Sequence, residues 1–169
     1  MKKVLIVCLG NICRSPTAEA VLKARAKKLG VEVKVDSAGT IGYHEGKTPD
    51  SRSMAAGEKR GYSFKGIFSR QVRSSDFTEF DLILAADTQN LADLKAQCPT
   101  HLHYKLALFL EYGEQSQSAI PDPYYGGDDG FENVLDLIEA ASDKILAKLW
   151  IKLPEQKRRY NTLRVIWLF

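Results

Sequence analysis

The sequence predicts an α/β fold made of a single domain, in which a four-stranded parallel sheet carries helices on both faces. Three observations support this prediction. The chain has 169 residues, which is enough for one domain with its own core. Short apolar runs rich in β-branched residues alternate with longer amphipathic segments, as in parallel α/β sheets. Neither a repeat nor a linker interrupts this rhythm, so we expect one domain over residues 1–150 and a tail over 151–169.

Two strand–helix units account for the first half of the chain. Val4–Val7 is apolar and β-branched, as expected of a buried strand. Ser15 can cap a helix, Pro16 suits its first helical position, and Gly30 ends it. The remaining predicted elements are a period-two strand at 31–35, a polar loop from 36, and a helix at 50–60 that Gly61 ends.

Two further units follow in the second half. The apolar run at 81–86 predicts the third strand, after which Asp87 caps a helix reaching about residue 97. We interpret residues 104–110 as a fourth strand or a strand with a turn. A polar, glycine-rich loop then extends to Gly130 and precedes a long amphipathic helix at 131–150.

The composition narrows the class of protein. The chain is 44% hydrophobic and 27% charged, as in ordinary globular proteins, and its net charge of +3 is too small to indicate a nucleic-acid partner. We expect no stable membrane insertion, because no apolar run is long enough to span a bilayer. The start Met1-Lys2-Lys3 before an apolar run resembles a signal peptide, but the run is too short. Three cysteines, an odd number, favour a reducing cytoplasmic location over a disulfide scaffold.

The tail over 151–169 is basic and then apolar, and it ends in Trp167-Leu168-Phe169. We expect it either to dock on the body of the protein or to be disordered. A basic and apolar anchor for a partner or a membrane surface is the alternative.

The loop between the first strand and the first helix carries reactive side chains. Cys8 and Arg14 are spaced C-x5-R, and the loop ends where a helix begins. A helix N-terminus offers free N–H groups and a partial positive charge, which favour a thiolate and bind anions. Arg14 offers a planar fork of donors for two phosphate oxygens. Gly10 allows the backbone to turn inward, Asn11 tolerates a left-handed backbone, and Ser15 can donate to the Cys8 sulfur. This loop is therefore predicted to bind an anion above a nucleophile.

The string C-L-G-N-I-C-R-S-P-T-A-E resembles the signature of the low-molecular-weight protein tyrosine phosphatases. The D-P-Y-Y stretch that starts at Asp122 is similar to the acid loop of that family, and residues 36–39 and 77–84 resemble its framework. The resemblance covers roughly residues 3 to 150, and the M-K-K start and the wording of the motif look like those of a bacterial member. The sequence of the loop contains neither the nucleotide-binding motif G-x-x-x-x-G-K-[ST] nor the dinucleotide-binding motif G-x-G-x-x-G. The loop is therefore not predicted to bind a nucleotide or a dinucleotide.

The resemblance implies a metal-independent protein-tyrosine phosphatase that needs no cofactor. Cys8 would attack phosphorus, Arg14 would hold the equatorial oxygens, and Asp122 would protonate the leaving oxygen and then activate water. Tyr43, Tyr124 and Tyr125 would form an aromatic wall along the cleft. This wall would favour a phosphotyrosine ring over the shorter phosphorylated side chains of serine and threonine. The substrate-binding residues implied are Leu9, Gly10, Asn11, Ile12, Cys13, Ser15, Tyr43, Tyr124 and Tyr125.

Two roles are possible for Cys13. Cys13 is either a packing residue or a resolving thiol that pairs with Cys8 on oxidation, and Cys98 is expected to be structural.

Some family members carry a histidine near residue 66 that supports the loop asparagine, and residues 65–68 here contain none. Asp87 and Ser37 are the candidates for that support.

Three rival functions stay open at this point. An arsenate reductase needs more thiols in the second half of the chain than Cys98 alone. A protein-arginine phosphatase typically has Thr where this chain has Ile12. A non-catalytic phosphopeptide-binding module would be favoured by loss of Cys8 or Asp122, and both are present.

The resemblance also implies the partners. We expect phosphotyrosine proteins as substrates, either an autophosphorylated tyrosine kinase or host proteins, and inhibition by phosphate-like oxyanions. The expected oligomeric state is a monomer or a weak dimer.

Overall fold

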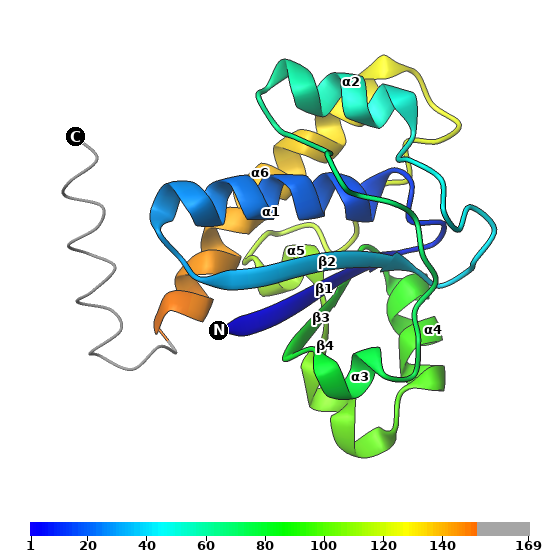
Figure 1. Cartoon of the computed structure of the whole chain (residues 1–169), viewed down its shortest axis with the longest axis vertical. Helices are drawn as coiled ribbons and strands as arrows, with labels where there is room; N and C mark the ends of the chain where they lie inside the picture. The colour runs from blue at the N-terminus through cyan, green and yellow to red at the C-terminus, as the bar shows by residue number, and fades with distance from the viewer. Residues whose placement is uncertain (152–169) are drawn as a thin grey trace.

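The sheet lies at the centre of the fold. The computed structural model describes residues 1–151, and in this part of the chain four parallel strands lie in the order β2-β1-β3-β4 (Figure 1). The predicted four-stranded parallel sheet is thus confirmed. Residues 152–169, which make up nearly all of the predicted tail, lie outside the described residues. The strands are β1 (Lys2–Cys8), β2 (Val33–Gly39), β3 (Leu82–Ala85) and β4 (Leu106–Leu108).

Helices cover both faces of the sheet because its central strand is apolar on both sides (Figure 1). Val4 and Ile6 of β1 pack with α1, α5 and α6, whereas Leu5 and Val7 pack with α3 and α4. α2 lies beside α6, on the outer side of α1. The helices are α1 (Arg14–Leu29), α2 (Ser51–Lys59), α3 (Asp76–Glu79), α4 (Thr88–Gln97), α5 (Phe109–Tyr112), α6 (Asp128–Ile151) and the 3₁₀ helix at Thr100–Lys105.

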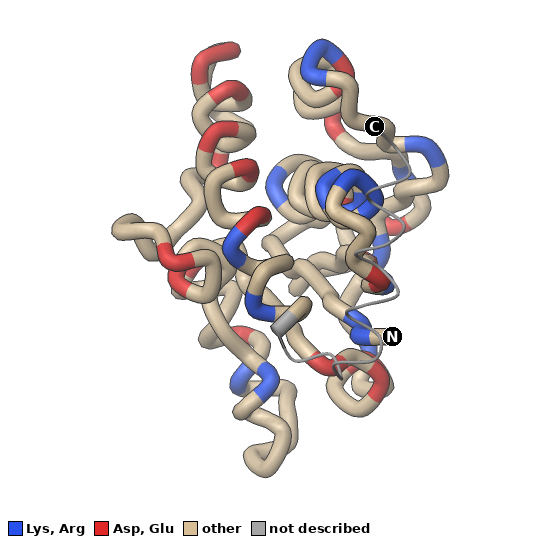
Figure 2. Tube along the Cα trace, turned by 90° about the vertical axis from the view of Figure 1, so that its left-hand side faces the viewer, with Lys and Arg blue, Asp and Glu red and all other residues tan. Residues whose placement is uncertain are grey.

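Charged residues join α6 to its neighbours. Acidic residues recur along α6 from its first turn, and its lysines lie toward its C-terminal end, which suits the helix dipole (Figure 2). Arg60 pairs with three of these carboxylates, those of Glu132, Asp136 and Glu139. Arg25 of α1 pairs with Glu139 and with Asp143. These ion pairs hold α1 and α6 in one layer and tie the C-terminal end of α2 to it.

Several predicted boundaries are wrong. The second strand spans residues 33–39 and not 31–35, so the stretch expected to be a polar loop continues the strand. Polar side chains fit there because Asp36 and Ser37 both find hydrogen-bond partners. The fourth strand has only three residues, between a 3₁₀ helix and α5, and is shorter than the strand, or strand with a turn, that was expected over 104–110. The last helix begins at Asp128, three residues before the predicted start.

The strand order places the loop after β1 at a crevice. β1 lies between β2 and β3, so the chain moves to opposite sides of β1 in successive units. In open α/β sheets ligands bind at the carboxyl end of strands at such a point. Cys8 is the last residue of β1 and is paired with Gly39, the last residue of β2. None of the helices in residues 1–151 has both the length and the apolar character needed to cross a bilayer.

Candidate active site

The loop from Cys8 to Arg14 turns its carbonyl groups outward. The carbonyl oxygens of Cys8, Leu9 and Ile12 accept backbone N–H groups of Thr40, Ile41 and Asp50 at 2.8–3.1 Å. The Gly10 carbonyl accepts the Ser69 hydroxyl at 3.1 Å. Within a trans peptide the C=O and N–H groups point in opposite directions. The N–H groups of residues 9, 10, 11 and 13 therefore point toward the concave side of the loop, where an anion can be bound.

Asn11 holds the loop from behind. Its φ of 55° is the left-handed backbone that the sequence led us to expect. Its amide nitrogen donates to the hydroxyls of Ser15 (2.8 Å) and Ser37 (2.9 Å), and its oxygen accepts the Arg70 N–H at 3.0 Å. Ser37, one of two expected supports, thus contacts Asn11. The main chain of Arg70 is a partner that sequence reasoning missed.

Ser15 does not cap the first helix, contrary to the prediction. The helix begins at Arg14 with Cys13 as its N-cap, so Ser15 and Pro16 lie within the first turn. The hydroxyl of Ser15 lies 3.0 Å from the Cys8 sulfur instead. Pro16 causes no loss there, because N–H groups of the first turn have no partner within the helix. Both Cys8 and Ser15 are buried.

The side chain of Arg14 is fixed on three sides. Nη1 donates to Asp87 Oδ2 at 2.6 Å and to the Ile120 carbonyl at 3.1 Å, and Nη2 lies 3.6 Å from Asp122 Oδ2. Burial lowers the pKa of Arg14, but the neighbouring Cys8, Asp87 and Asp122 outweigh it and raise the pKa overall. The guanidinium therefore stays charged. Asp87, the second expected support of Asn11, holds this arginine instead.

Asp122 and the tyrosines complete one cavity of about 400 Å³. Asp122 Oδ1 accepts the Tyr124 N–H at 3.1 Å, which fixes the carboxyl at the rim. Tyr124 and Tyr125 meet edge to face with ring centroids 4.9 Å apart, and Tyr43 stands largely exposed on the opposite loop. The cavity is lined by Cys8, Leu9, Gly10, Ile12, Cys13, Arg14, Ile41, Tyr43, His44, Asp122, Tyr124 and Tyr125.

The predicted site residues occupy two places. Asn11 and Ser15 lie behind the loop, and all the other predicted catalytic and substrate-binding residues line the cavity. Sequence reasoning missed Ile41 and His44. His44 meets Tyr43 edge to face at 4.8 Å, and a Cβ at Gly10 would lie 3.0 Å from its ring. The only signal for His44 was its place beside Tyr43 in a polar loop.

The three cysteines are all free, and Cys98 is buried away from the cavity. Burial raises the pKa of Cys13 to about 12, against a hydrogen bond from Ser53 that lowers it. Cys13 is therefore a neutral thiol in the same cavity as Cys8. Over residues 1–151 no group of three or more His, Cys, Asp or Glu side chains is placed to hold a metal ion.

Comparison with known proteins gives one family. The model of the low molecular weight phosphotyrosine protein phosphatases matches residues 3–156. A low molecular weight protein-tyrosine-phosphatase of Bacillus subtilis is 41% identical over 152 residues, covering 88% of this chain and 96% of the relative. The human low molecular weight phosphotyrosine protein phosphatase is 42% identical over 137 residues, covering 79% and 86%.

A solved structure agrees in fold as well as sequence. The crystal structure of a protein tyrosine phosphatase from Entamoeba histolytica superposes with a TM-score of 0.84 at 43% identity. The match covers 88% of this chain and 97% of that one.

Proposed function

The chain belongs to the low molecular weight phosphotyrosine protein phosphatase family and is a protein-tyrosine phosphatase; from this premise we propose that it hydrolyses phosphotyrosine through a phosphocysteine formed on Cys8, without a metal. One observation carries the proposal. The buried Cys8, the charged Arg14 and the carboxyl of Asp122 line one cavity above the N-terminus of α1. A nucleophile, an oxyanion site and an acid are what a two-step phosphoryl transfer requires.

In the first step the Cys8 thiolate attacks phosphorus opposite the ester oxygen. A sulfur–phosphorus bond forms as the phosphorus–oxygen bond breaks, and Asp122 gives its proton to the leaving phenolate. The inward N–H groups of the loop and the fork of Arg14 hold the three equatorial oxygens, where negative charge is concentrated. The Ser15 hydroxyl, 3.0 Å from the sulfur, stabilises the thiolate before attack.

In the second step water hydrolyses the phosphocysteine. Asp122 is now a carboxylate and takes a proton from the attacking water, after which the sulfur leaves as thiolate. Inorganic phosphate is released and Asp122 is again protonated. The same two side chains therefore serve both halves of the reaction, and the atoms and charges balance without a metal ion.

The exposed tyrosines account for the substrate class. Tyr43 on one loop and the pair Tyr124 and Tyr125 on another line the same cavity, which supports an aromatic substrate ring placed among them. We propose phosphotyrosine proteins as substrates, with an autophosphorylated tyrosine kinase and host proteins as the two source classes. Phosphate-like oxyanions would compete for the same loop.

Cys13 supports a redox extension of the proposal. Peroxide would oxidise the Cys8 thiolate to a sulfenic acid, and the Cys13 thiol would attack that sulfur to form a disulfide with release of water. A thiol reductant would reverse the reaction. Cys13 supports this role because it lines the same cavity as Cys8, although its thiol must first lose a proton, which its raised pKa slows.

The test is hydrolysis of p-nitrophenyl phosphate in EDTA, with phosphotyrosine, phosphoserine and phosphoarginine measured beside it. Cys8→Ser should abolish turnover of phosphotyrosine, and the matched variant Cys98→Ser should retain it, since Cys98 lies away from the cavity. Activity that requires a divalent metal, or that survives Cys8→Ser, would refute the mechanism. Turnover of phosphoarginine or of arsenate with a thiol reductant, in place of phosphotyrosine, would select one of the rival chemistries.

A further inference from the structure

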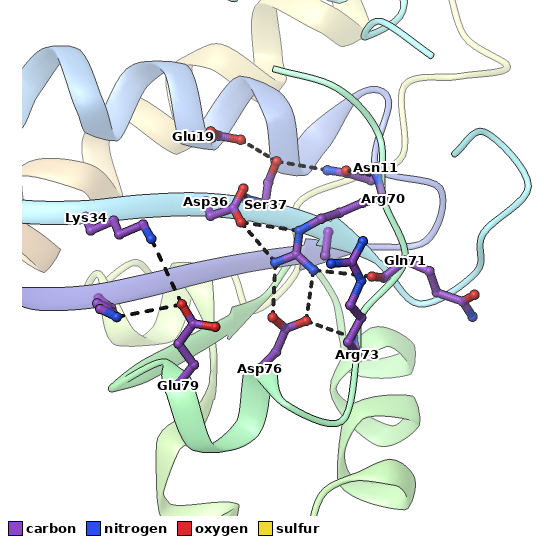
Figure 3. Close-up of polar contacts among 12 residues, drawn as sticks. Asn11, Glu19, Lys34, Asp36, Ser37, Arg70, Gln71, Arg73, Asp76 and Glu79 are labelled. Carbon is purple, nitrogen blue, oxygen red and sulfur yellow. Dashed lines mark hydrogen bonds and ion pairs between the residues drawn. The ribbon is translucent and has the colours of Figure 1, made fainter. Parts of the chain in front are cut away.

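We call the loop from Cys8 to Arg14 the phosphate loop. A chain of hydrogen-bonded polar groups runs behind it, from α1 to the segment before α3 (Figure 3). Glu19 of α1 accepts the Ser37 hydroxyl at 2.5 Å, and Ser37 accepts the Asn11 amide at 2.9 Å. Glu19, Ser37 and Asn11 are 4%, 1% and 1% exposed. Buried groups of this kind are stable only where every donor meets an acceptor.

The amide of Asn11 has a single workable orientation. The Arg70 main-chain nitrogen is a donor only, so the Asn11 oxygen must face it at 3.0 Å. The NH₂ group of Asn11 consequently faces both serine hydroxyls, and each of its hydrogens is used. The orientation of this amide therefore depends on where the Arg70 N–H lies.

Glu19 fixes the direction of the remaining bonds. A carboxylate accepts and does not donate, and Glu19 forms an ion pair with Lys23 at 2.5 Å. The Ser37 hydroxyl proton therefore goes to Glu19, leaving its oxygen to accept from Asn11. The opposite arrangement would place two donors of Asn11 and Ser37 against each other.

The donor–acceptor order of the hydrogen bonds extends through Ser15 to the Cys8 sulfur. Ser15 accepts one hydrogen of Asn11 at 2.8 Å, so its own proton must go to another group. The Cys8 sulfur lies at 3.0 Å and the Ala38 carbonyl at the longer distance of 3.4 Å. Ser15 is thus the donor to Cys8, and a bond donated to sulfur favours the thiolate.

Arg70 cannot turn its N–H away. Its guanidinium bridges Asp36 of β2 (3.0 Å) and Asp76 of α3 (2.9 Å), as Figure 3 shows. Its carbonyl accepts the Gly39 N–H at 2.8 Å, at the end of β2. The buried Asp76 is held in turn by the Arg73 N–H at 2.8 Å. Three contacts thus pin Arg70, whose main chain orients Asn11.

We propose that Glu19 and Arg70 are positioning residues of the phosphatase reaction, which fix the two ends of this hydrogen-bond chain so that Ser15 donates to the Cys8 thiolate. Neither residue lines the cavity. The inference rests on the proposed function for its catalytic consequence, but not for the state of the Cys8 sulfur.

The decisive experiment measures alkylation of Cys8 by iodoacetamide against pH, with the modified residue identified by mass spectrometry. Glu19→Gln keeps the shape of the side chain but adds a donor, so the direction of the chain is lost. A hydrogen bond to a charged group is worth roughly a tenfold effect or more. We expect the midpoint pH of alkylation to rise by about one unit and kcat on phosphotyrosine to fall about tenfold, with KM changed less.

A double-mutant cycle shows whether Glu19 acts through Ser37. Once Ser37→Ala has removed the link, Glu19→Gln should shift the alkylation midpoint no further. Glu132→Gln is the matched control, because Glu132 pairs with Arg60, does not line the cavity, and its loss should leave the midpoint unchanged. If Glu19→Gln does not fold, the shift in Ser37→Ala alone decides, and an unshifted midpoint there overturns the proposal.

Arg70→Lys tests the Arg70 end of the hydrogen-bond chain. Lysine keeps the charge but cannot bridge two carboxylates as a fork. We expect a higher alkylation midpoint and several-fold weaker competition by inorganic phosphate, whereas the exposed Arg73→Lys should change neither. Unchanged midpoints in both Glu19→Gln and Arg70→Lys would overturn the inference. Shifted midpoints in a protein without phosphatase turnover would support it while refuting the proposed function.

Discussion

Arg14 and Asp87 are joined by a 2.6 Å hydrogen bond between Nη1 and Oδ2, although 73 residues separate them in the chain. The other oxygen of Asp87 accepts the Asn90 N–H at 2.7 Å and caps α4. One carboxylate therefore ties the arginine of the phosphate loop to the first turn of a helix on the opposite face of the sheet. Its two roles can be separated by substitution.

Asp87→Asn should lower kcat/KM about tenfold without changing stability. Asparagine caps a helix as well as aspartate does, but its neutral oxygen holds a guanidinium less firmly. Asp87→Ala should lose both roles and about 1 kcal/mol of unfolding free energy. Phosphotyrosine kinetics and urea unfolding of the two variants check this. Full kcat/KM in Asp87→Asn would contradict the role given to Asp87.

Asp122→Ala should lower kcat on phosphotyrosine by about 10²–10⁴-fold, the range for loss of a general acid. The loss should be smaller on p-nitrophenyl phosphate, because a better leaving group needs less protonation. The comparison is a series of aryl phosphates with leaving groups of graded acidity. Asp93→Ala on α4 is the matched control, since Asp93 contacts Gln89 and not the cavity. An equal loss on every substrate would argue against proton donation by Asp122.

Arg52 should support the aromatic wall. Its guanidinium lies 5.4 Å from the Tyr124 ring centroid and 4.8 Å from that of Phe131, and it pairs with Asp50. Arg52→Ala should raise KM for a phosphotyrosine peptide roughly two- to fivefold with little change in kcat. Lys59→Ala on the same helix should leave KM as it is. A fall in kcat with an unchanged KM would show that Arg52 acts elsewhere.

Stability should fall at alkaline pH because of Cys13. Its pKa is raised from the ordinary 9.0 to about 12 by burial, so above pH 9 the unfolded chain releases a proton that the folded chain retains. Stability is then complete below pH 9 and is lost as pH rises toward 12. Between pH 8 and pH 10 the loss is about 1.4 kcal/mol larger in wild type than in Cys13→Ala. Parallel losses measured by denaturant unfolding in reductant would disprove it.

Gly39→Ala should disturb the phosphate loop more than the rest of the fold. A Cβ there would lie 2.7 Å from the Leu9 carbonyl oxygen, which belongs to the loop backbone and cannot move alone. We expect competition by inorganic phosphate to weaken by about an order of magnitude, beside a destabilisation of about 1–3 kcal/mol. Gly113→Ala, whose Cβ would lie 2.5 Å from Ala141, should destabilise without weakening phosphate binding in the folded fraction.

Patterns between neighbouring residues in the chain were sufficient to predict the order of the strands and helices and the residues of the phosphate loop. The apolar run at 4–7 and the spacing of Cys8 and Arg14 depend on neighbours in the chain, so pattern and resemblance found them. Asp122 came from resemblance to the acid loop, because an Asp-Pro pair alone is a common turn. Boundaries were less accurate where a tertiary contact overrides local preference, as at Asp36 and Ser37, which were expected in a loop and lie in β2.

The supports of the site were decided by the tertiary structure. Ser37 lies 26 residues from Asn11, Arg70 lies 59 from it, and Asp87 lies 73 from Arg14. No periodicity or spacing marks such pairs, because the sheet brings them together only after β1, β2 and β3 have aligned at their carboxyl ends. The sequence alone predicted which residues react, since the proposed nucleophile and the oxyanion loop are contiguous in the chain. The fold decided how they are held, since a hydrogen bond requires a partner placed within about 3 Å.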